Sequence, residues 1–332
     1  MVGRAETKRL LKYLTLKGLA SPEDKIEKLS SQGLSGEVYS LNSGGKEFII
    51  KFYRKGDWKT AAKEKQMYQI LSQHNVPVPK VYLTDPKGKI AGNPFIMMQR
   101  IRGESFSKIL KQGKEREFVK ALALSLHRLH SINIKDLKLN LPAKRFNDEI
   151  SDLKILAGVL LPFSTAIRKF NKTYKLIAEL SAYNVEGNPP ALLHGDCAPE
   201  NVVYSNGLVY LIDLEGMYVG DPAYDLGYAY HALRIGAFSR PELADYLIEI
   251  YEKIHGKIRN LDVYKRLAAL KTAVLIEFLR SFNPFSLFFI GFKRAMNFIA
   301  GQGRKFMKFI ANYSLTYAER GYYPGIHRNK NY

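Results

Sequence analysis

The sequence predicts an α+β fold in two lobes, a small one with an antiparallel sheet and one helix and a larger one that is mainly helical. Three observations indicate this. The 332 residues are enough for one large domain or two modest ones, each with its own core. Short segments rich in β-branched and aromatic residues occupy residues 25–99. After Gly103 the apolar residues recur at helical spacing, so the lobes should join near residues 99–103.

The small lobe, residues 1–100, should contain four strands and one helix. Strand-like segments are found at 37–41, 47–53, 80–84 and 94–99. The helix should follow Trp58, because a set of residues recurs there at a period of 3.6 and would share one face. That set is Ala61, Glu64, Met67, Tyr68 and Leu71.

The large lobe, residues 101–332, should be built from amphipathic helices. One is marked by Phe118, Leu122, Leu126 and Leu129, and others are expected within 145–184, 240–256, 262–282 and 304–319. The exception is a strand pair between residues 201 and 212. A cleft between two lobes is where a ligand is expected.

Composition favours a cytoplasmic protein. Cys197 is the only cysteine, so the chain carries no intramolecular disulfide, which fits a reducing compartment. The first twenty residues lack the apolar core of a signal peptide. The longest uncharged aromatic run, 281–292, is shorter than the about 20 residues that cross a bilayer and contains Pro284, so no transmembrane segment is predicted.

The formal net charge of +20 allows two interpretations. One is an anionic partner, since a charge this large influences long-range association. The other is a lysine-rich solvated surface. In the C-terminal region, basic and aromatic residues are interleaved between 280 and 309, which suits contact with nucleic acid or membrane, although a helical core with solvated cations is the preferred interpretation. Nothing in the sequence indicates the oligomeric state.

The residues between 194 and 213 carry the chemistry. Asn206-Gly207 between two apolar runs is a strong hairpin signal. Counting outward from this loop places Asn201 opposite Ile212, next to Asp213, at about 5 Å. Asp196 lies on the loop leading into the hairpin. Oxygen-bearing side chains so placed suit Mg²⁺ with a base beside it, although an ordinary hairpin could carry any one of these residues.

This segment resembles the catalytic and metal-binding signature of the aminoglycoside phosphotransferase and choline kinase group, relatives of the protein kinases. The pattern is met at His194-Gly195-Asp196, at Asn201 after four further residues, and at Ile212-Asp213. The resemblance implies a bilobal protein-kinase-like fold. It also implies that Asp196 is the catalytic base and that Asn201 and Asp213 hold Mg²⁺. Protein kinases proper have an arginine where Gly195 stands, which favours a small-molecule acceptor.

A lysine within an apolar strand supports this interpretation. Lys51 interrupts the segment 47–53, which costs desolvation unless its ammonium meets an anion. Glu64, on the inward face of the following helix, offers a carboxylate. Kinases use a lysine paired with a helix glutamate to orient triphosphate oxygens. Alternatively, Lys51 lies on an edge strand and Glu64 pairs with a neighbouring lysine in solvent.

Two further segments would contact the nucleotide. Gly33, Ser35 and Gly36 lie where a phosphate-covering loop between the first two strands is expected, although such a pattern is often an ordinary turn. By resemblance, Gln99 and Ile101 would offer backbone groups to the base, with Met98 behind it.

Four residues could serve either substrate or structure. His194 is expected to position the catalytic loop, and Asp225, at the start of a helix, to brace that loop by accepting backbone N–H bonds. Glu215 and Asp221 could contact substrate or metal, or brace the fold. His127 and His130 resemble the Leu-His that ends the first large-lobe helix of the group, which implies a structural role for them.

The resemblance therefore implies a kinase that uses ATP and Mg²⁺, with nucleotide bound by residues 1–100. Residues 101–332 would carry the catalytic loop, the metal site and the acceptor. GTP stays open as a donor, and so does the identity of the hydroxyl acceptor. Two alternatives are an atypical serine/threonine protein kinase and a non-enzymatic protein that binds nucleic acid or membrane through its basic surface.

Overall fold

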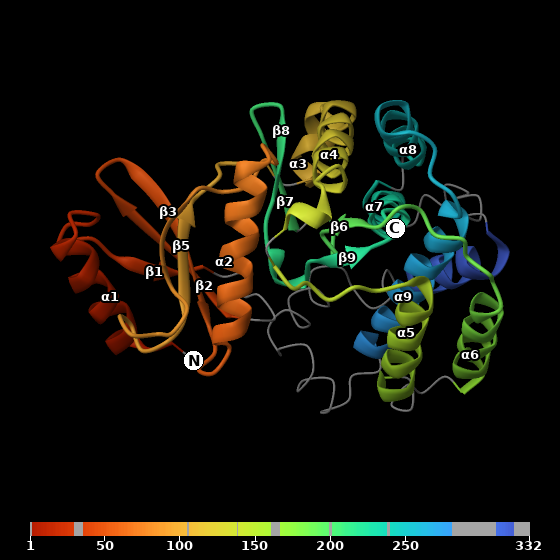
Figure 1. The fold of residues 1–332 in the computed structure, drawn as a ribbon, viewed down its shortest axis with the longest axis horizontal. Coiled ribbons are helices and arrows are strands. Elements are labelled where there is room, and N and C mark those ends of the chain that lie inside the picture. The colour runs from red at the N-terminus through yellow and green to blue at the C-terminus, as the bar shows by residue number, and fades with distance from the viewer. Residues whose placement is uncertain are drawn as a thin grey trace. The chain divides into compact units, whose positions relative to one another are not determined.

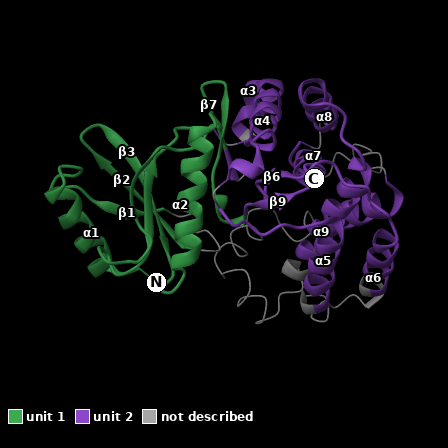
Figure 2. Ribbon diagram, viewed as in Figure 1, with its two compact units in different colours: residues 1–103, 203–216 green, residues 104–202, 217–332 purple. Residues whose placement is uncertain are grey.

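The computed structural model describes residues 2–29, 36–104, 106–137, 139–160, 167–198, 201–237, 240–280 and 310–321 (Figure 1). The chain divides into two units (Figure 2). Unit 1 comprises Met1–Gly103 and Val203–Gly216, and unit 2 comprises Glu104–Val202 and Met217–Tyr332. The first change of unit, after Gly103, lies close to the boundary predicted near residue 100. The return of residues 203–216 to unit 1 is not part of the linear division drawn from the sequence.

Unit 1 contains a five-stranded antiparallel sheet. Its order is β1-β2-β3-β5-β4. The strands are β1 (Ile26–Lys28), β2 (Gly36–Ser43), β3 (Lys46–Tyr53), β4 (Val81–Asp85) and β5 (Phe95–Gln99). The four segments predicted as strands correspond to β2 to β5. β3 lies in the middle of the sheet and pairs with both β2 and β5.

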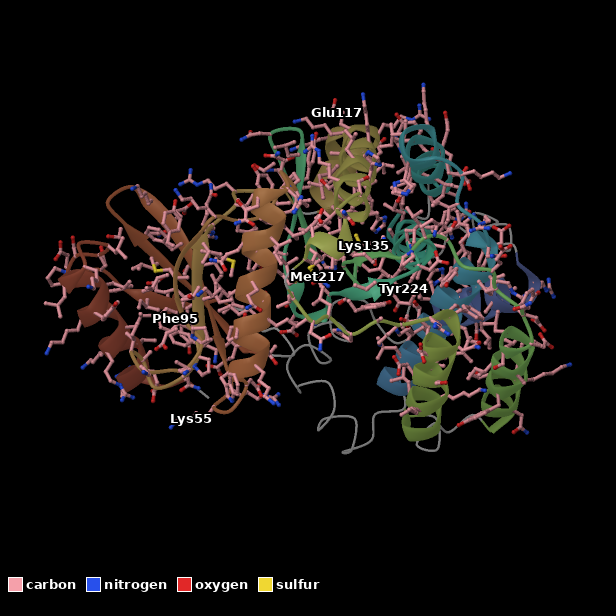
Figure 3. All side chains as sticks on the ribbon, viewed as in Figure 1. Lys55, Phe95, Glu117, Lys135, Met217 and Tyr224 are labelled. Atoms are coloured by element: carbon pink, nitrogen blue, oxygen red, sulfur yellow. The ribbon has the colours of Figure 1, made fainter. Side chains whose placement is uncertain are left out.

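Two helices cover opposite faces of this sheet, α1 (Arg4–Leu16) and α2 (Trp58–Gln73) (Figure 1). Leu10 and Leu14 of α1 pack in one cluster with the alternate β3 residues Phe48, Ile50 and Phe52. Phe95 of β5, labelled in Figure 3, belongs to the same cluster. The single helix predicted for this part of the chain corresponds to α2, so α1 is an additional element.

The face that α2 buries is the predicted one. Its buried residues are Ala61, Glu64, Met67, Tyr68 and Leu71. This face meets the opposite side of the sheet, toward which alternate residues of β3 project. A buried glutamate on an otherwise apolar face requires a partner.

The predicted hairpin is present as β7 (Val202–Ser205) and β8 (Leu208–Leu211), which form a two-stranded sheet. Asn206 and Gly207 both have positive φ, 51° and 75°, as the tight turn predicted for them requires. The hairpin strands are anchored within unit 1, since the backbone N–H of Leu211 donates to Pro77 O at 2.9 Å. A short helical turn, η4 (Leu214–Gly216), follows.

Unit 2 is mainly helical. Its helices are α3 (Phe106–Gln112), α4 (Glu115–His130), the short η1 (Ile134–Asp136), α5 (Phe146–Leu160), α6 (Ile167–Ser181), α7 (Ala223–Gly236), α8 (Glu242–His255) and α9 (Leu261–Arg280). α7 packs extensively on α9, and α4 packs on α8. A small antiparallel pair, β6 (Ala191–Leu193) with β9 (Tyr218–Gly220), lies among them. The sheet of unit 1 and the helices of unit 2 confirm the predicted α+β class.

The C-terminal part is described only at residues 310–321, which are helical from 310 to 320. The basic and aromatic residues at 281–309, for which a membrane or nucleic-acid contact was considered, lie outside the described residues. Among the helices that the structure does describe, none is both long enough and apolar enough to span a bilayer.

Candidate active site

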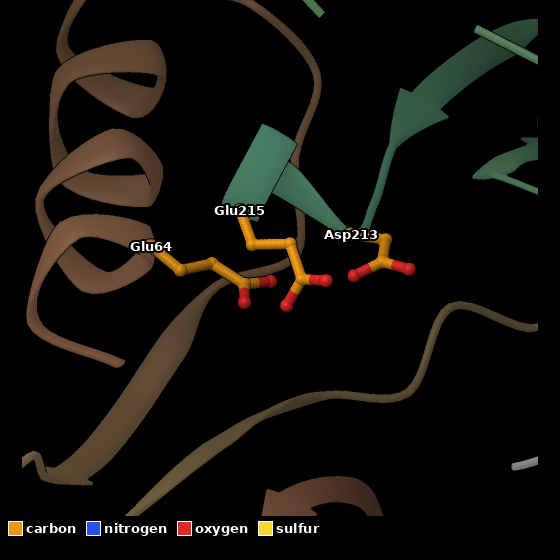
Figure 4. A group of neighbouring side chains, drawn as sticks. All are labelled: Glu64, Asp213 and Glu215. Carbon is orange, nitrogen blue, oxygen red and sulfur yellow. The ribbon is translucent and has the colours of Figure 1, made fainter. Parts of the chain in front are cut away.

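Unit 1 gathers one ammonium group and three carboxylates. Lys51 Nζ donates to Glu64 Oε2 at 2.7 Å, to Asp213 Oδ1 at 2.6 Å and to Glu215 Oε2 at 3.1 Å. The lysine is in the central strand β3, and the expected pairing with Glu64 is present. Figure 4 shows the three acidic side chains, with Glu64 on α2, Asp213 on the segment that follows β8 and Glu215 on η4. The edge-strand alternative for Lys51 is excluded, because β3 has a neighbour on each side.

The local structure explains why these side chains meet. Residues 51 and 53 of β3 project from the same face of the sheet, opposite to Phe52. That face lies against α2, where Glu64 is fully buried. Leu214 donates its backbone N–H to Glu64 Oε1 at 3.3 Å, and Lys63 Nζ donates to Glu215 O at 2.9 Å. These bonds fix the segment after β8 against α2.

The charges in this cluster shift the pKa values of their neighbours. Burial lowers the pKa of Lys51, but the negative charges of Glu64, Asp213 and Glu215 outweigh burial, so the net pKa is raised and the group stays an ammonium. Burial raises the pKa of Glu64, and attraction to Lys51 opposes this change. Lys51 therefore attracts all three carboxylates, whereas Asp213 and Glu64 repel each other and raise the pKa of Glu64 further.

Asp213 is held in an unusual backbone conformation. Its φ is +62°, in the left-handed region that few residues other than glycine adopt. Such strained residues cluster at functional sites. Asp213 and Glu215 have side chains that are each 25% exposed, so solvent can reach both carboxylates.

The acidic groups of unit 1 fit a divalent cation. Glu64, Asp213 and Glu215 each place one oxygen within 4.8 Å of the other two. Mg²⁺ prefers oxygen ligands and is bound in proteins through one or two carboxylates together with substrate phosphates. Asp213 and Glu215 would be the ligands, since their side chains are partly exposed whereas that of Glu64 is fully buried.

Unit 2 holds the loop that carries Asp196. Nδ2 of Asn201 donates to Asp196 Oδ2 at 2.7 Å and to Asp196 O at 3.0 Å. Asn201 therefore fixes the carboxylate of the predicted base with its amide nitrogen, and its amide oxygen is the atom that a cation would bind. Asp213, the other predicted metal ligand, belongs to unit 1, so the predicted meeting of Asn201 with Asp213 stays a prediction.

Asp225 braces this loop from the start of α7. Its Oδ2 accepts the backbone N–H of His194 at 2.7 Å, and its Oδ1 accepts that of Gly195 at 2.9 Å. His130 Nε2 lies 3.2 Å from Asp225 Oδ2, and His130 Nδ1 lies 2.7 Å from the hydroxyl of Tyr251. His130, His194, Asp225 and Tyr251 are buried, and Gly195 is partly exposed. The backbone of this loop is therefore held by a hydrogen-bond network that runs through Asp225 and His130 to Tyr251.

The remaining predicted residues of this region have structural contacts. His194 is fully buried, and its Nδ1 accepts the backbone N–H of Asp196 at 3.3 Å. Asp221 accepts bonds from the backbone and side chain of Asn188, at 3.0 and 2.8 Å, and from the backbone N–H of Ala223 at 2.9 Å. Asp221 thus joins the loop before β6 to the start of α7.

The nucleotide residues predicted by resemblance are placed only in part. Gly33 and Ser35 lie outside the described residues. Gly36 is the first residue of β2, and a Cβ atom there would lie 2.0 Å from Phe52 O, so close strand packing alone requires glycine. Met98 is buried in β5. The N–H of Gln99 donates to Lys80 O at 2.8 Å, so it could reach a base only by breaking that bond, and Ile101 lies just beyond β5.

Two tyrosines in unit 1 contact the site without having been predicted. The hydroxyl of Tyr53 donates to Glu64 Oε2 at 2.5 Å. Burial and the nearby charge of Glu64 raise the pKa of Tyr68 well above its usual value. The signal for Tyr53 was its spacing, because a residue two positions after Lys51 projects from the same face of the strand. Tyr68 follows Glu64 by four residues, one helical turn.

Comparison with known proteins identifies the class. Residues 26–270 match the model of the phosphotransferase enzyme family, so the chain belongs to this family. It is a kinase. An aminoglycoside 3'-phosphotransferase of Niallia circulans is 26% identical over 228 residues, which cover 64% of this chain and 83% of that protein. A protein described as serine/threonine-protein kinase YrzF, from Bacillus subtilis strain 168, is 32% identical over 93 residues, covering 27% of this chain and 40% of that one.

Solved structures show the same fold. One is described as an aminoglycoside phosphotransferase from Ralstonia eutropha JMP134 and has a TM-score of 0.68 at 16% identity, covering 95% of this chain and 98% of that one. Choline kinase LicA from Streptococcus pneumoniae has a TM-score of 0.57 at 20% identity, covering 89% and 99%. The resemblance to aminoglycoside phosphotransferases and choline kinases, and the kinase-like fold, are therefore confirmed.

Proposed function

We propose that this kinase transfers the γ-phosphoryl group of ATP, bound with Mg²⁺, to a hydroxyl group of a small molecule, with Asp196 as the general base. The observation that carries the proposal is the contact of the buried Lys51 ammonium with both Glu64 and Asp213, at 2.7 and 2.6 Å. An ammonium so placed suits the oxygens of a triphosphate. The relatives named for aminoglycosides and choline support a small-molecule acceptor.

Each group has one role in this proposal. Lys51, oriented by Glu64, binds oxygens of the nucleotide phosphates. Asn201 and Asp213 hold Mg²⁺, with Glu215 as a further oxygen donor. The bound ion would neutralise the charge that develops on the transferring group. Asp196, held by Asn201 and by the braced loop, accepts the proton of the acceptor hydroxyl. The oxygen of that hydroxyl forms the new bond to the γ-phosphorus, while the bond from this phosphorus to ADP breaks.

The donor nucleotide and the location belong to the same proposal. Solved structures of the fold include an aminoglycoside phosphotransferase with GDP, at a TM-score of 0.65, and a spectinomycin phosphotransferase with ADP, at 0.62. ATP is the proposed donor, GTP is to be tested beside it, and the predicted contacts of Gly33, Ser35, Gly36, Met98, Gln99 and Ile101 with the nucleotide are proposals too. The cytoplasm, which supplies these nucleotides, is the proposed compartment.

The test is a nucleotide-consumption screen with amino sugars, choline, homoserine, sugars, nucleosides and anionic lipids. Asp196→Ala is the blank, and we expect it to lose about 10²- to 10⁴-fold in kcat, as general-base removal does, while it retains nucleotide binding. Asp213→Ala should instead weaken binding of the Mg–nucleotide complex. Asp262→Ala, at a side chain that is 89% exposed, is the matched control and should leave both unchanged.

The same screen separates the alternatives. Labelling of casein-like proteins in preference to small alcohols would favour a protein kinase. Binding of RNA or liposomes that weakens strongly with salt, without nucleotide consumption, would favour a non-enzymatic binder. Full activity of Asp196→Ala would overturn the proposed mechanism.

A further inference from the structure

The carboxylate of Glu64 is bound by more groups than the lysine pairing requires. Its Oε2 accepts from Lys51 at 2.7 Å and from the hydroxyl of Tyr53 at 2.5 Å, and its Oε1 accepts from the backbone N–H of Leu214 at 3.3 Å. Glu64 is fully buried and Tyr53 is 1% exposed. The hydroxyl of Tyr53 is thus a buried donor directed at the same oxygen that holds the lysine.

Tyr53 is itself fixed by the backbone around it. It is the last residue of β3, where it pairs with Gly36 of β2. Its N–H donates to Pro94 O at 2.9 Å, and its carbonyl oxygen accepts from Asn93 Nδ2 at 3.1 Å. A side chain anchored on a rigid strand in this way can hold a partner in one position.

The need for donors other than Lys51 follows from the three carboxylates around its ammonium. The ammonium is shared among Glu64, Asp213 and Glu215, and the last two of these side chains are partly exposed. When phosphate oxygens compete for the ammonium of Lys51, the ion pair between Lys51 and Glu64 weakens, and other donors have to keep Glu64 in position. An unmatched charge in a buried site is costly, and a neutral O–H donor stabilises it without adding a competing cation.

We propose that Tyr53 is a positioning residue of this kinase, whose hydroxyl fixes Glu64 so that Lys51 stays directed at the nucleotide phosphates. This inference rests on the proposed function. Tyr53 would thus act on nucleotide binding through Glu64, to which its hydroxyl donates.

The experiment measures the Kd of Mg–ADP by calorimetry and the steady-state kinetics of ATP consumption. Tyr53→Phe keeps the ring and removes only the donor. We expect Kd for Mg–ADP and KM for ATP to rise about tenfold, as loss of a charge-assisted hydrogen bond does, with a smaller change in kcat. Tyr39→Phe is the matched control, because its buried hydroxyl donates to Glu37 Oε2 at 3.0 Å on the face covered by α1. It should leave Kd unchanged.

A double-mutant cycle separates positioning from packing. If Tyr53 acts through Glu64, Tyr53→Phe should have no further effect on Kd in a Glu64→Gln background. Additive effects would overturn the inference, as would an unchanged Kd in Tyr53→Phe. Loss of folding in Tyr53→Phe, seen by circular dichroism, would also overturn it in favour of a purely structural hydroxyl.

Failure of the proposed function gives a different result. In that case wild-type protein would not bind Mg–ADP, or Lys51→Met would bind it normally. If Lys51→Met and Glu64→Gln both weaken binding while Tyr53→Phe does not, the proposed function stands and only the role of Tyr53 is rejected.

Discussion

Asp225 keeps a negative charge in the interior of unit 2 because hydrogen-bond donors surround it. It is fully buried and receives two backbone N–H groups and the ring of His130. Burial raises the pKa of this carboxyl, but the hydrogen bond and charge of His130, together with the N–H of Gly195, lower it below its usual value. The carboxylate therefore stays charged while it fixes the loop at residues 194–195, which leads to the proposed base Asp196.

Replacing this charge should loosen the loop. Asp225→Asn puts an NH₂ group where an oxygen faces N–H donors, so we expect a loss of about 3 kcal/mol in the free energy of unfolding, together with a lower kcat. Urea unfolding followed by circular dichroism measures the first and ATP consumption the second. Asp262→Asn, at an exposed side chain, should change stability by less than about 0.5 kcal/mol. Equal stability of the two variants would contradict the bracing role.

His231 on α7 should make stability depend on pH. Its ring is buried, Nε2 lies 3.0 Å from the hydroxyl of Ser314, and burial together with Arg234 lowers its pKa to about 3. The unfolded chain, with an ordinary histidine pKa of about 6.5, binds a proton that the folded protein excludes. The stabilising contribution is therefore complete above pH 6.5 and is lost as pH falls from 6.5 toward 3.

The measurement compares wild type with His231→Asn, which keeps a polar side chain near Ser314. Between pH 6.5 and 4, the free energy of unfolding of wild type should fall more steeply, by up to about 1.4 kcal/mol per pH unit. Parallel curves for the two proteins would show that His231 is protonated in the folded state as readily as in the unfolded one.

At the scale of elements, the packing of α7 on α9 depends on one small residue. A Cβ atom at Gly227 of α7 would lie 2.7 Å from the backbone carbon of Tyr264 and 2.9 Å from the nitrogen of Lys265, both on α9. Backbone atoms cannot move aside as a flexible side chain can. The helices therefore approach as closely as they do only because residue 227 has no side chain.

Gly227→Ala tests this contact, because the close approach and helix propensity predict changes of opposite sign in the free energy of unfolding. Helix propensity alone predicts that alanine stabilises α7 by about 1 kcal/mol. Overpacking between α7 and α9 predicts a loss of about 1–3 kcal/mol, and we expect this loss to be the net result in chemical unfolding. Gly113→Ala is a control without a close neighbour, where only the strain of a φ of +71° acts. A stabilised Gly227→Ala protein would contradict the close contact.

Elements with a strong local pattern could be predicted, and those defined by distant partners could not. The strands β2 to β5, the buried face of α2 and the Asn206-Gly207 hairpin follow from alternation, helical period and turn chemistry. α1 was missed because Leu10 and Leu14 are its only buried residues in a helix rich in lysine and arginine. The additional strand β1 has three residues, too few to show a period.

The residues of the site divide in the same way, into those marked by a local sequence pattern and those defined only by distant partners. Lys51 and Asp213 are 162 positions apart, yet each is marked by its own sequence context, so both could be predicted. The bonds from Asn188 to Asp221 carry no motif, and the only signal for the bond from Tyr53 to Glu64 is the spacing of Tyr53 from Lys51. For Gly36 the sequence suggested phosphate contact, whereas the structure provides a packing reason that is independent of any ligand.

For the molecule as a whole, the net charge of +20 should reduce stability at low salt. Like charges repel across the folded surface, and salt screens them, with a Debye length of about 30 Å at 0.01 M and about 8 Å at 0.15 M. We expect Tm to rise as NaCl increases over this range, by about 2–4 °C for each kcal/mol gained. Differential scanning fluorimetry measures the change, and KCl should give the same curve. A falling Tm would mean that ion pairs such as Lys51 with its three carboxylates outweigh the repulsion.

The only thiol of the chain, Cys197, follows the proposed base directly and is 2% exposed. Burial raises its pKa well above the usual value, and the nearby Asp225 and Asp196 add to this shift, so in the folded state the sulfur is both enclosed and a poor nucleophile. A thiol reagent can modify it only during transient excursions of the loop. The rate at which a thiol reagent labels Cys197 in wild-type protein therefore measures how often the loop opens. Labelling should slow in any state that stabilises the loop in its folded conformation.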